Sequence, residues 1–424
     1  MVKTLNVFLA GVWAGTLDQT TNGDVSFSYR DEYRGDPAST PLSLSMPLSA
    51  SRYKKRAVLP FFQGLLPDSD IALRALGSRF GVSWRNPFAL LEFMGADLSG
   101  ALEVLPEERN PSTAEVSSVD RQLSESEVGR ILRSVITEYQ SGNATGADRG
   151  YFSVAGAQPK IALRRDGDQW SIPDAQHPTT HIIKPSAGDF PRVDVAEFLT
   201  MNAARSLGLA VAHCELMEVD GISCFVTERY DRVSTSGHNR RLHQEDLAQA
   251  LSVLPQNKYQ RLDGGPGLAA IAQLLGSVPE GADRIDAMRR FYHAVVFNTV
   301  AGCTDAHAKN YSLMLSGSRV TLAPLYDLVT FAGYWDGQSP ITMAMSIEGE
   351  YRADRISPSS LASGAARFGW GDESAGLVDS LRRGVAPAFE QWGTQLITTS
   401  PETAEFVERV VHRVRQLPLV ATDF

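Results

Sequence analysis

The sequence predicts an α+β fold in which a strand-rich N-terminal half precedes a mainly helical C-terminal half. Short apolar or alternating segments separated by turn residues fill the first half of the 424 residues. Longer segments with apolar residues at helical spacing dominate the second half. Polar or glycine-containing stretches and the change of period predict three parts, residues 1–110, 111–245 and 246–424.

The first part is predicted to be a β-rich subdomain. Its expected strands, each bounded by turn residues, are residues 5–9, 12–17, 25–29 and 102–104. Residues 41–48 alternate apolar and polar side chains between prolines, a pattern that favours an edge strand. Two helices are expected, at residues 70–80 and 86–93, and Gly81 is placed to end the first.

The second part mixes strands with two amphipathic helices. The expected strands are residues 161–163, 181–185, 215–219 and 222–226, and the helices are residues 124–139 and 193–207. In the third part the period becomes helical. The helices predicted there are residues 244–251, 268–275, 282–300, 377–383 and 402–414, with a strand at residues 320–322.

Composition excludes several classes of protein. With 43% hydrophobic and 21% charged residues, the chain has the make-up of a globular protein, and no run approaches the roughly 18 apolar residues of a membrane span. The three cysteines form no Cys-x-x-Cys pair, so we expect a reduced, cytoplasmic protein without a disulfide framework or zinc site. A net charge of −9 disfavours non-specific nucleic-acid binding by the chain as a whole.

Three polar residues in the C-terminal part form a set that phosphoryl transfer uses. Asp305 and Asn310 stand five residues apart after a predicted helix, and Asp327 follows 17 positions later. In kinases an aspartate orients the substrate hydroxyl, while an asparagine and a second aspartate hold magnesium against nucleotide phosphates. An Asp-x-x-x-x-Asn match alone is weak evidence, so upstream elements must support it.

Two upstream segments supply the missing elements. Residues 152–160 form a small-residue turn that ends in Lys160, where backbone N–H groups can approach phosphate oxygens; an ordinary hairpin turn is the alternative. Lys184 ends an apolar strand, so it either meets an anion or reaches the solvent. Glu197 on the following helix either pairs with Lys184 or compensates the helix dipole.

Taken in order, these segments resemble the HipA family of bacterial serine/threonine kinase toxins. The residues that carry the resemblance are 153–160, 181–185, 228–232, 243–246, 304–310 and 326–328, together with 41–48 and 65–68 in the first part. The resemblance spans nearly the whole chain. It implies a two-lobed, protein-kinase-like fold with an extra N-terminal β-rich subdomain and a mainly helical C-terminal lobe.

The resemblance also implies a role for each matching position. Asp305 would be the catalytic base, Asn310 and Asp327 would ligate Mg²⁺, and Ser153 would be the autophosphorylated serine of the loop. The residues implied to bind ATP are Ala155, Gly156, Ala157, Gln158, Pro159, Lys160, Lys184, Glu228, Arg229, Tyr230, His307, Lys309, Asn310, Tyr326 and Asp327. A phosphorylated Ser153 would repel ATP phosphates and so inactivate the enzyme.

Two positions depart from the family pattern. Ala306 stands where glycine is frequent, and Pro159 stands where some members carry glutamate, which removes one N–H donor from the loop. Neither departure changes the implied catalytic base, the implied Mg²⁺ ligands or Lys184, so we still expect activity.

The implied partners are a HipB-like helix-turn-helix antitoxin, operator DNA reached through that antitoxin, and a translation-related substrate such as the glutamyl aminoacyl-tRNA synthetase. No membrane association is expected. Two other functions stay open on the residues alone: a kinase-shaped transcriptional co-repressor with little catalysis, and a kinase for a small molecule or lipid.

Overall fold

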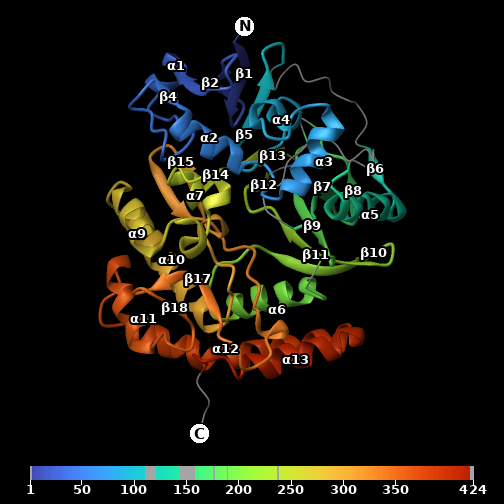
Figure 1. The fold of residues 1–424 in the computed structure, drawn as a ribbon, viewed down its shortest axis with the longest axis vertical. Helices are drawn as coiled ribbons and strands as arrows, with labels where there is room; N and C mark the ends of the chain where they lie inside the picture. The colour runs from blue at the N-terminus through green and yellow to red at the C-terminus, as the bar shows by residue number, and fades with distance from the viewer. Residues whose placement is uncertain are drawn as a thin grey trace. The chain divides into compact units, whose positions relative to one another are not determined.

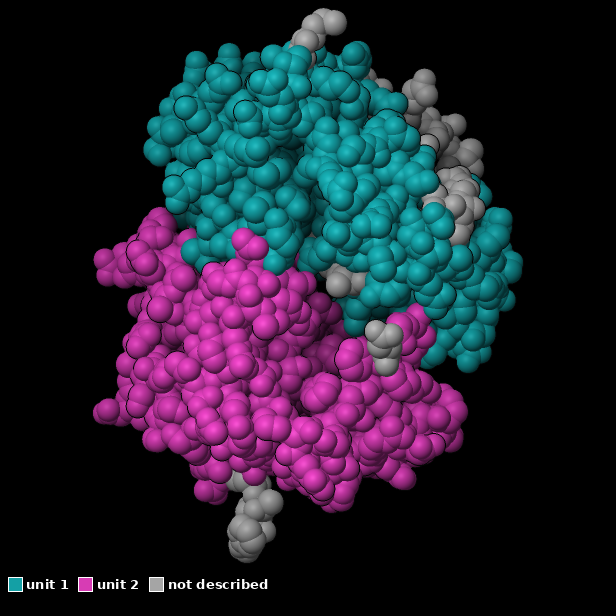
Figure 2. Space-filling model, viewed as in Figure 1, with its two compact units in different colours: residues 1–185, 217–256, 314–319 teal, residues 186–216, 257–313, 320–424 magenta. Residues whose placement is uncertain are grey.

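The computed structural model describes residues 2–109, 121–143, 158–174, 177–188, 190–235 and 238–420, with helices and antiparallel sheets along the chain (Figure 1). The chain divides into two compact units, coloured separately in Figure 2. Unit 1 holds residues 1–185, 217–256 and 314–319, and unit 2 holds residues 186–216, 257–313 and 320–424. The three parts expected from sequence, 1–110, 111–245 and 246–424, stay a prediction.

Unit 1 begins with a five-stranded antiparallel sheet in the order β4-β3-β2-β1-β5. Its strands are β1 (Lys3–Leu9), β2 (Val12–Gln19), β3 (Val25–Tyr29), β4 (Arg52–Lys54) and β5 (Leu102–Pro106). The β1–β2 hairpin turns at Ala10 and Gly11, both with positive φ, as a tight two-residue hairpin turn requires. The strands expected at residues 5–9, 12–17, 25–29 and 102–104 are all present.

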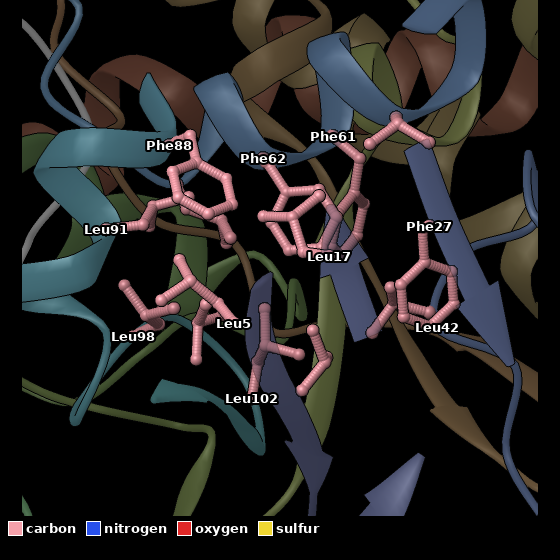
Figure 3. Close-up of a cluster of buried hydrophobic side chains, with 14 of the residues drawn as sticks. Leu5, Leu17, Phe27, Leu42, Phe61, Phe62, Phe88, Leu91, Leu98 and Leu102 are labelled. Carbon is pink, nitrogen blue, oxygen red and sulfur yellow. The ribbon is translucent and has the colours of Figure 1, made fainter. Parts of the chain in front are cut away.

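Helices pack in one hydrophobic core with this sheet. They are α1 (Asp31–Gly35), α2 (Lys55–Gly64), α3 (Asp70–Phe80) and α4 (Pro87–Met94). Ser69 and Asn86 cap α3 and α4 by accepting backbone N–H bonds, and Gly81 ends α3 in the left-handed conformation, as predicted. Figure 3 shows the shared core, in which side chains from β1–β3, β5, α2 and α4 point toward one another.

The second sheet of unit 1 has six strands in the order β10-β11-β9-β7-β8-β6. The strands are β6 (Gln122–Leu123), β7 (Ile161–Asp166), β8 (Gln169–Ser171), β9 (His181–Pro185), β10 (Cys214–Val219) and β11 (Ile222–Glu228). Helix α5 (Glu125–Ser141) starts at a capping box made by Ser124 and Glu127. Its apolar stripe, Val128, Ile131, Leu132 and Val135, packs in one core with Ile161, Leu163 and Ile183 of the sheet.

The other strands and helices complete the described part of the chain. The remaining strands are β12 (Arg232–Thr235), β13 (His238–Arg241), β14 (His243–Asp246), β15 (Ser312–Ser316), β16 (Arg319–Leu322), β17 (Thr342–Ile347) and β18 (Glu350–Arg352). The remaining α-helices are α6 (Val193–Ser206), α7 (Leu247–Ala250), α8 (Gln260–Asp263), α9 (Leu268–Ser277), α10 (Ala282–Val300), α11 (Pro358–Gly364), α12 (Ser374–Thr399) and α13 (Ala404–Val414). Within the described residues, no helix combines the length and the hydropathy that a bilayer crossing requires.

The prediction of an edge strand at residues 41–48 is wrong. The segment instead folds into turns with a single bridge between Ser43 and Met46. The Tyr29 hydroxyl accepts the Leu42 N–H at 2.6 Å and donates to the Met46 carbonyl at 2.7 Å, so one side chain replaces a strand ladder. Two apolar positions of the alternating pattern are Leu42 and Met46. Both side chains are fully buried, although they belong to a turn and not to a strand.

The prediction of a helix at residues 244–251 is also partly wrong. Residues 243–246 form strand β14, and the helix α7 begins only after Asp246. Asp246 and Gln249 form a capping box there, with the Gln249 N–H donating to Asp246 at 2.8 Å. A cap residue marks a helix start, and the residues before it are consequently outside the helix.

The turn at residues 42–45 is held by Glu245, and the burial of this carboxyl group predicts a pH dependence of stability. Glu245 accepts the Ser43 hydroxyl at 2.5 Å and the Leu44 N–H at 2.8 Å. Burial raises the pKa of Glu245 from 4.5 to about 8. A carboxyl group with a raised folded-state pKa stabilises the protein below its ordinary pKa, and this contribution is lost as the pH rises toward 8.

We therefore expect the free energy of unfolding to fall between pH 6.5 and 8 by at most about 1.4 kcal/mol per pH unit. Glu245→Gln should remove this slope, whereas Glu218→Gln on the exposed side of β10 should keep it. Urea unfolding at both pH values measures the effect. The neighbouring His243, whose pKa is lowered from 6.5 to about 4, changes its contribution below this window. An unchanged slope in the Glu245 variant would contradict the assignment.

Candidate functional site

The loop that carries Asp305 follows the 19-residue helix α10 of unit 2, which is labelled in Figure 1. The Cys303 N–H returns to the Asn298 carbonyl at 2.8 Å, which closes the helix end. Gly302 has φ 68°, and a Cβ there would lie 3.1 Å from Leu417. Glycine relieves both the backbone strain and the close approach, so the chain turns sharply out of the helix into the loop.

The main chain of Asp305 is held by the loop itself. Its carbonyl oxygen accepts the His307 N–H at 2.8 Å and the Asn310 Nδ2 at 2.8 Å. The Asp305 side chain is 63% exposed, whereas His307 and Asn310 are buried. The loop therefore presents one carboxylate outward from a fixed backbone, as a group that meets an external hydroxyl requires.

The same hydrogen bond identifies the donor and acceptor ends of the Asn310 amide. Because Nδ2 donates to Asp305, the amide oxygen Oδ1 is the acceptor end of the side chain. Oxygen is the ligand atom that Mg²⁺ prefers. The short 3₁₀ helix at residues 308–310 and the strand β15 that follows fix the Asn310 backbone at the end of the loop.

Tyr326 ties the second aspartate to this loop. Its hydroxyl donates to the Lys309 carbonyl at 2.8 Å and lies 2.7 Å from the Ser312 hydroxyl. Tyr326 is the residue directly before Asp327, so a side chain from one segment is bound to the backbone of the other. Two of the predicted segments are thereby joined within unit 2.

The backbone around Asp327 is fixed on both sides. Leu325 forms a parallel bridge with Val211, and the Thr330 hydroxyl donates to the Ala301 carbonyl at 2.6 Å. Asp327 itself has φ 58°, a left-handed conformation that is costly for a residue with a Cβ. Such conformations persist where the surrounding structure imposes them, and they are frequent at functional sites.

In unit 1 the second sheet brings two lysines to one end of neighbouring strands. Ile161 of β7 pairs with Ile183 of β9, so continuing this register by one residue places Lys160 opposite Lys184. Lys184 is buried, and its Nζ lies 5.5 Å from the centre of the Phe225 ring. Two ammonium groups at one sheet end suit an anionic ligand.

The remaining residues of the predicted phosphate loop divide into two groups. Gln158 is half-buried and Pro159 is buried, directly before β7. Ser153, Ala155, Gly156 and Ala157 lie outside the described residues. The roles assigned to this loop stay predictions.

The segment predicted to be a hinge follows β11. Glu228 is exposed at the strand end and pairs with His181 in the β9–β11 ladder. The Arg229 N–H donates to the Thr180 carbonyl at 2.8 Å, and the Tyr230 hydroxyl donates to Gln244. These contacts fix the segment, while its predicted adenine contacts stay a prediction.

Arg229 belongs to a buried ionic network that the sequence did not reveal. Its guanidinium binds Asp231 at 2.8 Å and the Thr179 hydroxyl at 2.7 Å. Arg232 binds Asp97 at 2.7 Å, and Arg241 lies 4.0 Å from the same carboxylate. The Arg229 side chain is buried, and its guanidinium donates to Asp231, Thr179 and the Leu98 carbonyl, which favours a structural role for this side chain. Its assignment to the nucleotide stays a prediction.

The network shifts the pKa of its acids strongly. Burial alone would raise the pKa of Asp97, but Arg232, Arg241 and Arg229 together lower it well below 3.8. Arg229 and Arg232 overcome the same burial effect at Asp231 and lower its pKa to about 2. Both carboxylates are therefore ionised at neutral pH, with their charges balanced by arginines.

One residue at the site was missed from sequence. The Tyr259 hydroxyl donates to Asp305 Oδ1 at 2.5 Å, and the Tyr259 ring packs edge-on against His307 with ring centres 5.0 Å apart. His307 Nε2 lies 4.0 Å from the same Asp305 oxygen. Tyr259 precedes Asp305 by 46 positions in a segment without a recognisable motif, so no sequence signal indicated it.

Comparison with known proteins decides the family. The family model described as the HipA-like C-terminal domain matches residues 152–416, and that of the HipA N-terminal domain matches residues 5–105. The chain belongs to the HipA family. The suspected resemblance is thereby confirmed over most of the sequence.

Two curated relatives of this HipA-family chain are named as kinases. It is 34% identical to the putative kinase Y4mE of Sinorhizobium fredii, over 99% of both chains. It is 28% identical to the serine/threonine-protein kinase toxin HipA of Shewanella oneidensis, over 81% of this chain and 79% of the relative. The chain is thus a homologue of a HipA toxin kinase.

A solved structure confirms the predicted α+β, protein-kinase-like fold. The HipA-family chain superposes with a TM-score of 0.80 on one chain of a solved complex, that of the Shewanella oneidensis MR-1 toxin–antitoxin system HipA, HipB and its operator DNA. The match covers 97% of both chains at 23% identity. At this low identity, the agreement shows that the two chains share a fold.

Proposed function

We propose that this chain is an ATP- and Mg²⁺-dependent protein serine/threonine kinase, the toxin of a HipBA-like toxin–antitoxin module. The observation that supports this most is the Asp305 loop in a HipA-family chain. An exposed carboxylate stands on a backbone held by Asn310, and Tyr326 binds Asp327's segment to the same loop. Kinases use an aspartate as the base and an asparagine and a second aspartate as metal ligands, so these contacts support the proposal.

The donor atoms of the candidate metal site fit Mg²⁺. Asn310 and Asp327 offer one amide oxygen and one carboxylate, and Mg²⁺ is typically held by one or two carboxylates with substrate phosphates and water. Within the described residues there is no cluster of three or more His, Cys, Asp or Glu side chains suited to a metal. A site with so few protein ligands depends on the nucleotide to complete it. When bound, Mg²⁺ would neutralise charge on the phosphates.

The chain's own residues divide the remaining work. Asp305 accepts the proton of a substrate serine or threonine hydroxyl and orients it for attack. Lys184 and Lys160, at one sheet end, contribute positive charge for the phosphates, and Lys309 and His307 are assigned to the same role. Glu228 and Tyr230 are assigned to adenine. These roles are extended from the family pattern, position by position.

The partner proposed for this chain is a HipB-like helix-turn-helix antitoxin. The structural relative is a complex of HipA with HipB and operator DNA. The net charge of −9 suits a basic, DNA-binding partner and leaves DNA contact mainly to that partner. For the substrate we propose a translation protein such as the glutamyl aminoacyl-tRNA synthetase, on the family resemblance. Binding to either can be measured by titration with the purified protein.

The proposed activity includes autophosphorylation of Ser153, and this provides the direct test. Incubating the purified chain with ATP and Mg²⁺ should add the mass of one phosphate, located on the Ser153 peptide. Ser153→Ala should abolish this gain. If the wild-type chain neither gains phosphate nor phosphorylates the synthetase, while it still binds antitoxin and represses its operator, the co-repressor function is supported instead. Phosphorylation of a small molecule or lipid alone would support the third candidate.

Removing the second aspartate should impair metal use. We expect Asp327→Ala to lower phosphate transfer at millimolar Mg²⁺ by about 10²-fold or more, because a metal ligand is lost where phosphate charge must be neutralised. Raising the Mg²⁺ concentration should recover part of the rate. Asp379→Ala removes an equal charge from the exposed face of α12 and serves as the control. Equal Mg²⁺ dependence of the two variants would refute the metal role.

A further inference from the structure

The loop that carries Tyr259 is anchored independently of Asp305. The carbonyl of Tyr259 accepts the Asp263 N–H at 3.1 Å and the Gly265 N–H at 3.0 Å. The Gln260 side chain accepts the Ser346 N–H of β17 at 2.9 Å. The tyrosine therefore projects from the start of a segment whose backbone these bonds hold.

Glycine is required for this anchoring. A Cβ on Gly265 would lie 2.3 Å from the Asn257 carbonyl oxygen, and one on Gly267 would lie 2.3 Å from the Gln260 side chain. Both distances are far below van der Waals contact. The loop thus closes tightly on itself, and Tyr259 extends from its start.

Two of the hydrogen bonds to Asp305 end on its backbone carbonyl, and another ends on its side-chain carboxylate. His307 and Asn310 hold the Asp305 carbonyl, which leaves rotation about the side-chain bonds undetermined by these contacts. The Tyr259 hydroxyl donates to Oδ1 of the carboxylate, and its ring packs on His307, whose Nε2 faces the same oxygen. A hydrogen bond to a charged acceptor is among the stronger ones in proteins.

We propose that Tyr259 is a positioning residue for Asp305. Its hydroxyl fixes the rotation of the carboxylate, so that the proton acceptor is oriented before the substrate hydroxyl arrives. This inference rests on the proposed kinase function, in which Asp305 is the base. Pre-oriented catalytic groups avoid the cost of reorganisation during the reaction.

The role predicts a specific kinetic signature. Tyr259→Phe keeps the ring that packs on His307 and removes only the hydroxyl. We expect kcat for phosphate transfer to fall by about ten- to hundredfold, the factor that corresponds to one hydrogen bond to a charged group. KM for ATP and the melting temperature should stay as in the wild type, because neither depends on the rotation of Asp305.

Tyr334→Phe is the matched control. Tyr334 is also half-buried in unit 2, and its hydroxyl donates to the Pro191 carbonyl at 3.2 Å. This variant should keep the wild-type kcat. A Tyr259→Phe enzyme with unchanged kcat would overturn the positioning role. A raised kcat would overturn it too, because Tyr259 would then occupy the place of the substrate hydroxyl.

A measurement that does not depend on enzyme activity separates this proposal from the proposed function. In protein labelled at tyrosine ¹³Cζ, the Tyr259 resonance is the one missing from Tyr259→Phe. Asp305→Ala should move that resonance and leave that of Tyr334 in place. If it does not move, the contact is absent and the positioning role fails, whether or not the chain is a kinase. If it moves but the wild-type chain transfers no phosphate, Tyr259 still orients Asp305 while the kinase function fails.

Discussion

Asp305→Asn is expected to lower the rate of phosphate transfer by about 10²–10⁴-fold, the usual contribution of a positioned proton acceptor. Asparagine has nearly the same shape, but its amide cannot accept the proton of an attacking hydroxyl. Transfer to protein substrate and to Ser153 should fall together, because both use the same acceptor. Single-turnover transfer of labelled phosphate from ATP measures the effect.

The loop itself should tolerate this substitution. The bonds from His307 and Asn310 end on the Asp305 carbonyl, which asparagine retains. ATP affinity and melting temperature should therefore stay close to those of the wild type. Asp379→Asn on α12 supplies the control for the loss of one charge. Autophosphorylation at the wild-type rate in Asp305→Asn would refute the assigned mechanism.

Asp97→Ala is expected to lower the free energy of unfolding by about 3–5 kcal/mol, the cost of removing one partner from a buried ionic network. Asp97 is buried, binds Arg232 at 2.7 Å and accepts the Thr179 N–H at 2.8 Å. Its loss would leave Arg229 and Arg241 with less compensating charge in a buried environment. Urea unfolding followed by fluorescence measures the change.

An exposed ion pair provides the comparison. Asp168 lies 3.6 Å from Arg165 and is fully exposed, so Asp168→Ala should change stability by less than about 0.5 kcal/mol. The pH dependence gives a second test. The folded-state pKa of Asp97 is lowered, so its stabilisation is present above pH 3.8 and is lost as the pH falls below that value. If Asp97→Ala were as stable as Asp168→Ala, the network would contribute no net stability.

Elements with strong local signals were predicted closely. The helix expected at residues 193–207 is α6, Val193–Ser206, and that expected at 282–300 is α10 with the same bounds. Apolar periodicity and end signals determine such elements. The segment at 41–48 shows the limit of this reasoning, because its alternation arose from a buried turn held by Tyr29 and Glu245.

The residues of the candidate site also divide into those that local signals predicted and those that they did not. Asp305, Asn310 and Asp327 were predicted because kinase chemistry requires those side chains in that order. Tyr259 and the network around Asp97 were not, because their contacts join residues far apart in the chain. The assignment of Arg229 to the nucleotide stays a prediction. The structure adds that its guanidinium lies among Asp231, Asp97 and Thr179, contacts that no sequence motif indicated.

The sequence alone determined the α+β class, most helix and strand positions and the identity of the residues with assigned chemistry. These follow from side-chain type and spacing, which are local properties. Tertiary structure alone decided which side chain bonds to the Asp305 carboxylate, which buried charges around Asp97 and Asp231 neutralise one another, and how the 42–45 turn is held. Those outcomes depend on distances between residues separated by tens to hundreds of positions, and only the folded chain brings them within hydrogen-bonding range.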